Sequence, residues 1–490
     1  MQDMAGSFPA DLTVLRNGEP EYDRARAVFN LAGVPAPAEA VIARTVDEVR
    51  SAVRYAAAVG RPVRVLSTGH GSMNRGAMDD ALLIRVELTD GLRIDPTTGT
   101  AWVPAGTRWE GVVTAAAAYG LTALHGSSST VGAVGYLLHG GLSFYGRRHG
   151  VAANSVRSIE LVTATGDHIR VDAEHRAELF WALRGGGGGF GVVTAVEIEL
   201  IPVVGTISGS IVWPAEYAAA LIPTWREWAA TAPREITTNL RLLNLPELPH
   251  LPAELAGQQT VAIRGTAHAN TARDLDTTAR AVIDLIEPLR AIAEPTLNTW
   301  APATTVEVLR TQMDPESPTP VHASHRLLDA LPDATMEKLV DTTGPGSQSP
   351  LMVVELRQLG GAFADPLRPG GAFDRIASPW LYHAAGVALD TAAIEAIAGQ
   401  FASNSAVLAA HTTPYTVPSF AEDAAQHQQS FGPAIAEAVS AVRQSYDPDG
   451  LFRGDVAVGS TYALGASPER RFHNLYHDLQ ETSSNATAQD

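Results

Sequence analysis

The stretch AELFWALRGGGGGFGVVTAVEIELIPV, residues 177–203, joins a helical pattern to a strand pattern through five consecutive glycines. Within it, residues 186–191 fit the dinucleotide-binding pattern G-x-G-x-x-G. That pattern binds a dinucleotide where a strand precedes it and a helix follows, and here the order is reversed. A nicotinamide-binding Rossmann unit is therefore not expected. Five glycines in a row instead indicate that the backbone approaches something bulky closely.

The pattern of predicted helices and strands changes at about residue 206, just after this stretch. Before it, short β-branched runs closed by Gly, Pro or Asp predict strands in 61–67, 81–88, 99–106 and 190–203, a helix in 109–120 and a hairpin in 156–172. After it, longer patterns predict helices in 215–232 and 271–292 and strands in 258–269, 350–363 and 380–389, with Pro-rich connectors at 245–257 and 313–320. The second part therefore reads as an α+β domain.

Composition excludes several classes of function. The 490 residues carry 35 Lys and Arg against 53 Asp and Glu, a net charge of −18, which disfavours nucleic acid and anionic membranes as partners. Cysteine is absent, so disulfides, thiolate nucleophiles and thiolate metal sites are excluded, and we expect no metal site. The N-terminus shows no targeting pattern, so a cytoplasmic protein is expected. The polar tail, residues 481–490, is expected to be unstructured, and the oligomeric state is not indicated.

Two further segments are rich in small and hydroxyl side chains. The first is HGSSSTVGAVGYLLHGGLSFYGRRHG, residues 125–150, and the second is RVLSTGHGSMNRG, residues 64–76, which contains His70. Backbone N–H groups exposed by small side chains, with hydroxyls between them, can bind a diphosphate and a flat ring. Two such segments favour one large cofactor.

These segments, together with YDPDGLFR at residues 446–453, resemble the FAD-linked oxidases of the vanillyl-alcohol oxidase superfamily, in the berberine bridge enzyme-like branch. The resemblance is close over residues 36–204. It implies an α+β fold: a two-part FAD-binding domain of the PCMH type, with an inserted substrate domain built on an antiparallel sheet. The expected parts are residues 1–205 for the N-terminal FAD-binding part, 206–409 for the substrate domain, and 410–490 for the return to the FAD-binding domain.

The resemblance also implies how FAD is held. In this family the histidine of the corresponding turn is bonded to the flavin, and His70 stands there; a histidine that only caps the turn is the alternative. Many relatives form a second bond through a cysteine, whose place Ser128 takes here, so a single link through His70 is expected. The residues expected to bind FAD are Ser67, Thr68, Gly69, His70, Gly71, Ser128, Thr130, Val131, Gly132, Gly135, Gly140, Gly141 and Val193.

Catalytic candidates come mostly from the second domain, whose sheet faces the flavin in relatives. We expect Tyr415 to act as the base and Arg357 as the neighbouring cation, with Glu355, Tyr382 and the adjacent His383 as further candidates. Alternation along a strand places Glu355 and Arg357 on one face. Ordinary cross-strand pairs are the alternative for these residues.

A further catalytic candidate lies in the glycine-rich segment. His139 replaces the first glycine of a triplet found in relatives. It is expected either to take part in catalysis or to turn toward solvent.

The expected reaction is oxidation of a small, largely uncharged secondary metabolite at a carbinol or amine carbon, with O₂ reoxidising the flavin. Oxidation of a sugar or oligosaccharide is the first alternative. A redox-neutral protein, in which FAD shapes a pocket for cyclisation or binding, is the second. The partners are thus the small-molecule substrate and O₂.

Overall fold

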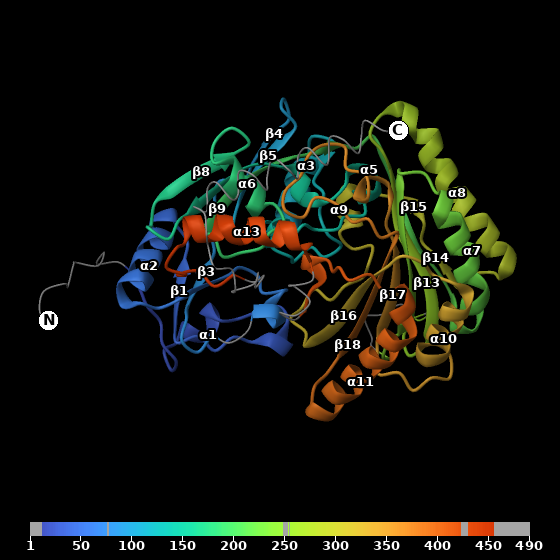
Figure 1. Cartoon of the computed structure of the whole chain (residues 1–490). Helices are drawn as coiled ribbons and strands as arrows, with labels where there is room; N and C mark the ends of the chain where they lie inside the picture. Colours follow the sequence, from blue (N-terminus) through green and yellow to red (C-terminus); the bar gives the residue numbers. More distant parts are fainter. Residues whose placement is uncertain (1–11, 76–77, 248–252, 254, 423–429, 455–490) are drawn as a thin grey trace, which may run out of the picture.

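The computed structural model describes residues 12–75, 78–247, 253, 255–422 and 430–454. These residues form two halves that lie side by side (Figure 1). The first half, blue to green, contains two main sheets, and the second contains one large antiparallel sheet. This is the expected mixed α/β architecture with an antiparallel sheet in its second part. The tail for which disorder is expected, residues 481–490, lies outside the described residues.

The first sheet of the N-terminal half is parallel. Its strand order is β1-β3-β2, with β1 (Glu39–Ala43), β2 (Val63–Leu66) and β3 (Leu82–Val86). Helix α2 (Val46–Val59) connects β1 to β2 and buries Val49 and Val53 in the core of this half. A capping box between Thr45 and Glu48 defines the start of this helix.

The second sheet is antiparallel and contains the predicted hairpin. Its strand order is β4-β5-β9-β7-β8, with β4 (Arg93–Asp95), β5 (Thr100–Pro104), β7 (Val156–Val162), β8 (His168–Asp172) and β9 (Val192–Glu199). Besides α2, the helices of this half are α1 (Tyr22–Ala25), α3 (Trp109–Ala117), α4 (Ala133–Leu138), α5 (Gly146–His149) and α6 (Ala177–Leu183). A short antiparallel pair, β6 (Leu121–Thr122) with β10 (Ile201–Pro202), closes this half. Helix α6 precedes the glycine run and β9 follows it, the reverse of a Rossmann unit.

The large sheet of the second half has the strand order β14-β11-β13-β12-β17-β18-β16, with β15 paired to β11. Its strands are β11 (Gly205–Pro214), β12 (Ile236–Asn244), β13 (Gln259–Ala269), β14 (Leu297–Asn298), β15 (Ala301–Pro302), β16 (Val321–Leu328), β17 (Val353–Gln358) and β18 (Trp380–Val387). Its helices are α7 (Ala218–Thr231), α8 (Leu275–Ile292), α9 (Thr305–Val308), α10 (Asp333–Thr343) and α11 (Thr391–Leu408). The strands of this sheet that were not anticipated from the sequence are β11, β12, β14, β15 and β16.

Alternation along the strands gives this sheet two different faces. Leu240, Leu242, Leu356 and Tyr382 belong to an apolar cluster that also includes residues of α7, α8, α10 and α11. The residues between them in sequence, among them Arg241, Glu355 and His383, therefore point to the opposite face. Charged and polar side chains thus face the first half of the molecule.

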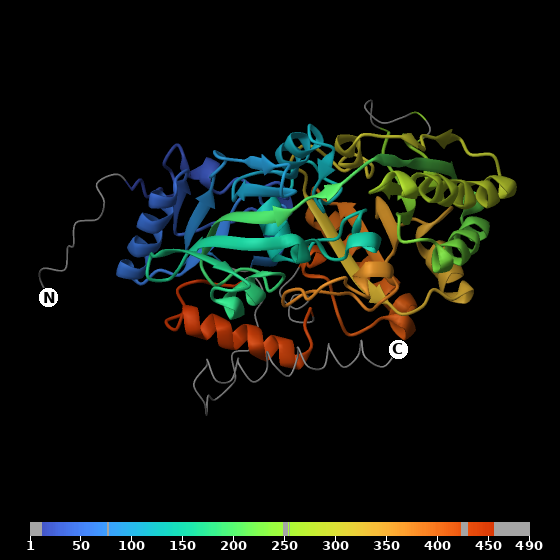
Figure 2. The same ribbon diagram turned by 90° about the horizontal axis from the view of Figure 1, so that it is seen from above.

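The chain then returns to the first half, as Figure 2 shows for the red helix α13 (Pro433–Tyr446). Beyond this helix, Phe452 forms a parallel bridge to Val63 of β2. The motif at residues 446–453 makes this turn because the Asp447 carboxylate accepts hydrogen bonds from the backbone N–H groups of Leu451 and Phe452. Within the described residues, no helix combines the length and apolar character needed to cross a membrane. The domain boundaries expected from the sequence remain predictions.

Candidate active site

A cavity of about 390 Å³ lies between the two halves of the molecule. Its first wall consists of the two small-residue segments and part of the glycine run, and its second wall consists of the large sheet. The segment Pro418–Glu422 and Phe452, from the returning chain, complete the lining. The cavity therefore draws on every part of the chain that the sequence motifs single out.

His70 lies on the first wall, in the turn that follows β2. Its ring stacks on Phe29 with centroids 3.8 Å apart, and its Nε2 lies 2.9 Å from Oγ1 of Thr130. Burial, and then the charge of Arg108, lower the pKa of His70 to about 4, so the imidazole is neutral at physiological pH. Gly69 makes the turn with φ +75, and a Cβ there would meet Val28 at 2.6 Å. Only glycine fits at this position.

Most of the residues predicted to bind FAD line this cavity. They are Ser67, Thr68, Gly69, His70, Gly71, Ser128, Val131, Gly132, Gly135 and Val193. Three others do not line it. Thr130 contacts His70, which does line the cavity. A Cβ on Gly140 would meet the Phe373 ring at 2.6 Å, and a Cβ on Gly141 would meet the Tyr136 ring at 2.2 Å, so these glycines permit close packing within the protein.

Tyr136 is a lining residue that the sequence did not single out. Its ring packs edge-on against Trp109 at 5.4 Å, in a space that glycines at 126 and 141 leave open. Its hydroxyl is buried and has no hydrogen-bond partner among the described residues. Burial raises the pKa of Tyr136, and the nearby charge of Arg357 partly opposes this shift. The sequence signal was weak because a tyrosine in a short helix resembles an ordinary core residue.

The glycine run, for which the sequence predicted a close approach to something bulky, packs closely against other protein segments. A Cβ on Gly186 would meet the carbonyl oxygen of Ala182 at 2.2 Å, and a Cβ on Gly189 would meet Cα of Gly454 at 2.7 Å. Gly188, Gly189 and Gly191 also line the cavity. The close neighbours seen here are therefore protein segments, with the cavity on one side.

The second wall carries a buried ion cluster. Glu355 of β17 is fully buried, and its two carboxylate oxygens each lie 2.7 Å from a guanidinium Nε, one of Arg241 and one of Arg357. Burial alone would raise the pKa of Glu355, but Arg357 and Arg241 hold it well below its usual range. Arg241 also donates to the carbonyl oxygen of Gln312 at 3.0 Å. Glu355 is therefore an ionised group that orients both arginines.

His383 of β18 lines the cavity beside this cluster. It is the register partner of Glu355, and its ring packs edge-on against Phe420 at 5.4 Å. Burial lowers the pKa of His383 to about 4; the charges of Arg241 and Arg357 contribute, and Glu355 opposes them. The imidazole is thus neutral and next to a carboxylate. The sequence suggested His383 as one of several candidates from this sheet.

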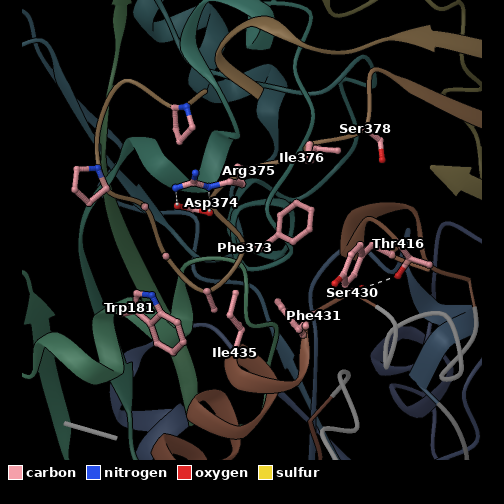
Figure 3. A pocket seen from close by; sticks show the side chains of 18 of the residues that line it. Trp181, Phe373, Asp374, Arg375, Ile376, Ser378, Thr416, Ser430, Phe431 and Ile435 are labelled. Carbon is pink, nitrogen blue, oxygen red and sulfur yellow. Dashed lines mark hydrogen bonds and ion pairs between the residues drawn. The ribbon is translucent and has the colours of Figure 1, made fainter. Parts of the chain in front are cut away.

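The structure does not bring Tyr415 or Tyr382 to this cavity. Tyr415 is 48% exposed and lines a separate cavity of about 570 Å³. That cavity lies among Trp181, Phe373, Phe431 and their neighbours (Figure 3). Tyr382 lies on the helix-covered face of the sheet, where its hydroxyl oxygen accepts a hydrogen bond of 2.7 Å from Asn404. Strand β18 directs the Tyr382 side chain away from the cavity, and the loop that contains Tyr415 does the same for its side chain.

His139 does line the cavity, together with the other two catalytic candidates, Arg357 and Glu355. It is half-buried, and its Nδ1 lies 2.7 Å from the carbonyl oxygen of Gly135. This geometry is compatible with the catalytic expectation and does not turn the whole ring toward solvent. No group of three or more His, Asp or Glu side chains in the described part of the chain could hold a metal ion.

Comparison with known proteins identifies an FAD-binding domain and relatives among oxidases and FAD-linked oxidoreductases. A family model described as an FAD binding domain matches residues 37–172. The (R)-6-hydroxynicotine oxidase of Paenarthrobacter nicotinovorans is 36% identical over 167 residues, which are 34% of this chain and 36% of that protein. The chain spans about a third to a half of the length of the first curated relatives.

Solved structures are similar over almost the whole chain. The wild-type BBE-like 1 protein of Physcomitrella patens has a TM-score of 0.78 at 19% identity, covering 92% of this chain and 98% of that one. A glucooligosaccharide oxidase from Acremonium strictum, described as carrying a 6-S-cysteinyl, 8α-N1-histidyl FAD, has a TM-score of 0.73 at 18% identity and covers 93% of this chain and 98% of that one. At these identities the likeness establishes the fold.

Proposed function

We propose that this chain, which has the fold and the FAD-binding domain of the FAD-linked oxidases of the vanillyl-alcohol oxidase superfamily, is an FAD-dependent oxidase of a small molecule. The observation that carries this proposal is the cavity between the two halves. One wall belongs largely to the segment that matches the FAD-binding domain, and the other presents a buried ion cluster and a neutral histidine. A cofactor and a substrate can therefore meet there.

The residues of the first wall fit FAD. Gly135 lines the cavity, and a Cβ built there would meet nothing within 4 Å, so the glycine leaves the space beside it open. The buried Tyr136 hydroxyl lacks a partner among the described residues, and a polar edge of a bound ring would supply one. Ser67, Thr68 and Ser128 add hydroxyls on the same wall. When bound, FAD supplies the two-electron oxidant and the route to O₂.

We propose that His70 holds FAD covalently, and that it is the chain's single link. With a hydrogen on Nε2 donated to Thr130, the lone pair remains on Nδ1, for which no hydrogen bond to a described residue is found. Burial keeps the ring neutral, the form in which imidazole is nucleophilic. The histidyl FAD of the glucooligosaccharide oxidase supports this role. A second link through sulfur has no candidate, because the chain contains no cysteine.

On the opposite wall, His383 is the group best placed to accept a proton from the substrate. It is neutral, reaches the cavity and lies opposite Glu355, whose negative charge stabilises the imidazolium formed when the proton arrives. In this proposal Arg357 binds the substrate, and Glu355 orients Arg357. The proton acceptor is thus a histidine of the sheet, and Tyr415 has no part in the step.

Anaerobic reduction tests the function. The purified, FAD-loaded protein is mixed without O₂ with a panel of alcohols, amines and oligosaccharides, and loss of the yellow flavin absorbance is followed. Bleaching by an alcohol or amine supports oxidation of a small metabolite, and bleaching only by oligosaccharides assigns a sugar oxidase, the class of the Acremonium strictum neighbour. Tight ligand binding without bleaching by any compound would instead indicate a redox-neutral protein.

A further inference from the structure

We infer that the substrate carries a carboxylate, which binds the two terminal nitrogens of Arg357. The inference rests on the proposed function because it concerns the same cavity. It departs from the expectation of a largely uncharged substrate, which was drawn from the net charge of the whole chain. Inside a cavity the nearest charges determine which ligand charge is favoured, because distant surface charges are screened by solvent and salt.

Arg357 is held in one orientation. Its Nε donates to Oε1 of Glu355 at 2.7 Å, and its guanidinium carbon lies 5.6 Å from the ring centre of Phe144 and 5.2 Å from that of Phe420. Its side chain is only 9% exposed and lines the cavity. Because Nε is occupied and two aromatic rings flank the group, the terminal nitrogens are fixed in position before a ligand arrives.

Those terminal nitrogens have no hydrogen-bond partner among the described residues, whereas Arg241, which also lines the cavity, is paired. Arg241 contacts both Glu355 and the carbonyl oxygen of Gln312, and Arg264 donates to the same carbonyl. A nearly buried guanidinium with unused donors leaves hydrogen-bonding capacity unfilled. The buried Nε of Arg264 has no partner among the described residues either, but Arg264 does not line the cavity. Arg357 is therefore the member of the cluster that can offer donors to a ligand in the cavity.

The local charge also favours an anion. The cluster contains three guanidinium groups, those of Arg241, Arg264 and Arg357, and two carboxylates, those of Glu355 and Asp314. Burial and the charge of Arg241 lower the pKa of Arg264 to about 9, so it still carries a positive charge at neutral pH. Among these five groups, and with His383 neutral, positive charges outnumber negative ones by one. A bound carboxylate would balance this excess.

A carboxylate fits Arg357 better than a single hydroxyl does. The terminal nitrogens of a guanidinium form a planar fork that matches the two oxygens of a carboxylate, with charge-assisted bonds. Arg357 is the register partner of Leu381, so it lies one diagonal step from His383 on the same face of the sheet. On neighbouring strands such positions are roughly 7–8 Å apart. The substrate is thus a short acid whose oxidised carbon lies close to its carboxylate.

The test uses benzoate, benzamide and benzyl alcohol as probes, and FAD-loaded full-length protein. Binding is measured by calorimetry, which needs no turnover, and the flavin reduction potential is measured in parallel. Wild type should bind benzoate about 10- to 100-fold more tightly than benzamide. Arg357→Gln should abolish this preference, and Arg357→Lys, which keeps a point charge, should retain part of it. Arg368→Gln, at an exposed ion pair with Glu199, is the matched control and should behave as wild type.

The results distinguish carboxylate binding by Arg357 from the absence of a carboxylate preference and from a role of Arg357 toward the flavin. Equal affinity for benzoate and benzamide in wild type, or an undiminished preference in Arg357→Gln, would overturn the inference. A shifted reduction potential with unchanged benzoate affinity would assign Arg357 to the flavin and also overturn it. Should Arg357→Gln fail to fold, the wild-type comparison and Arg357→Lys still decide. A protein that takes up no FAD contradicts the proposed function, and its benzoate preference can still be read.

Discussion

Glu355 of β17 and His383 of β18 are direct partners in the antiparallel register of the large sheet. Register partners of this kind point to the same face, so the carboxylate lies beside the imidazole at the cavity wall. Glu355 is also bonded to two arginines, which keep it ionised. A neutral histidine next to a fixed negative charge is suited to accept a proton.

Replacing His383 by Gln should slow anaerobic flavin reduction by roughly two to four orders of magnitude, the usual contribution of a general base. In wild type the rate should stay level from neutral pH downward and fall only near pH 4, because burial lowers the pKa of His383 to about 4 and the base fails when it is protonated. Stopped-flow reduction across pH measures both effects. A fall centred near pH 6.5, where free imidazole titrates, would contradict this assignment.

Replacing Glu355 by Gln should destabilise the protein by about 3–5 kcal/mol, because two buried guanidinium groups lose their partner. The pKa of Glu355 is depressed in the folded state, so its contribution is complete above the unfolded pKa of about 4.3 and is lost as pH falls below it. Urea unfolding at pH 7 and pH 4 measures the difference. Glu294→Gln, which removes an exposed pair with Arg290, is the control and should change stability by less than about 0.5 kcal/mol.

Replacing Tyr415 by Phe should leave flavin reduction unchanged. The side chain is 48% exposed and lines the second cavity, away from the ion cluster. The same stopped-flow experiment measures this variant. A loss of two orders of magnitude would return the role of base to Tyr415, as the sequence first suggested, and would require the loop at residues 415–420 to move.

The sequence predicted the architecture well where its patterns were local. Short β-branched runs located β2, β3, β5 and the β7–β8 hairpin, and the reversed order around the glycine run excluded a Rossmann unit. Strand β12 was missed because ITTNLRLLN mixes polar and apolar residues without a clear period, and its identity depends on pairing with β13 and β17. Pairing between distant segments is not visible in a single sequence.

In the candidate site, too, local motifs were easier to predict than contacts between distant segments. The residues predicted to bind FAD lie in contiguous motifs, and most of them line the cavity, whereas the sheet side depends on which face of each strand meets the cavity. That face is decided by the helices that cover the other one, so the sequence could not choose between Tyr382 and His383. Tyr136 was missed because its role follows from glycines at 126 and 141 that leave space for its ring.

His70→Ala should yield protein whose flavin is released entirely by acid precipitation, while wild-type protein should keep its yellow colour in the pellet. Thr130→Val should form the covalent link more slowly, since loss of the 2.9 Å contact with Nε2 removes the partner that favours a free lone pair on Nδ1. Mass spectrometry of the flavin peptide measures both. His175→Ala, at an exposed histidine paired with Asp172, should be fully flavinylated. Complete release of flavin from wild type would show that the link does not form.

A fragment of residues 1–205 should not bind FAD, although it contains the whole segment that matches the FAD-binding domain. The returning chain supplies part of the same structure: the backbone N–H of Val63 donates to Leu451 at 2.7 Å, and Phe452 lines the cavity. The core of the first half also includes Phe363 and Phe373, which lie far outside the fragment. Removing them exposes apolar surface, and β2 also loses its bridge to Phe452, so the fragment should be unstable.

The matched control for this prediction is a chain ending at residue 454, which retains every described residue of the cavity and should bind FAD as the full chain does. Flavin absorbance after gel filtration and thermal unfolding measure both proteins. Both variants lose the same C-terminal tail, so a difference between them reports on residues 206–454 alone. A folded, yellow fragment of residues 1–205 would show that the FAD-binding domain is continuous, and it would contradict the two-part organisation on which the placement of the cavity depends.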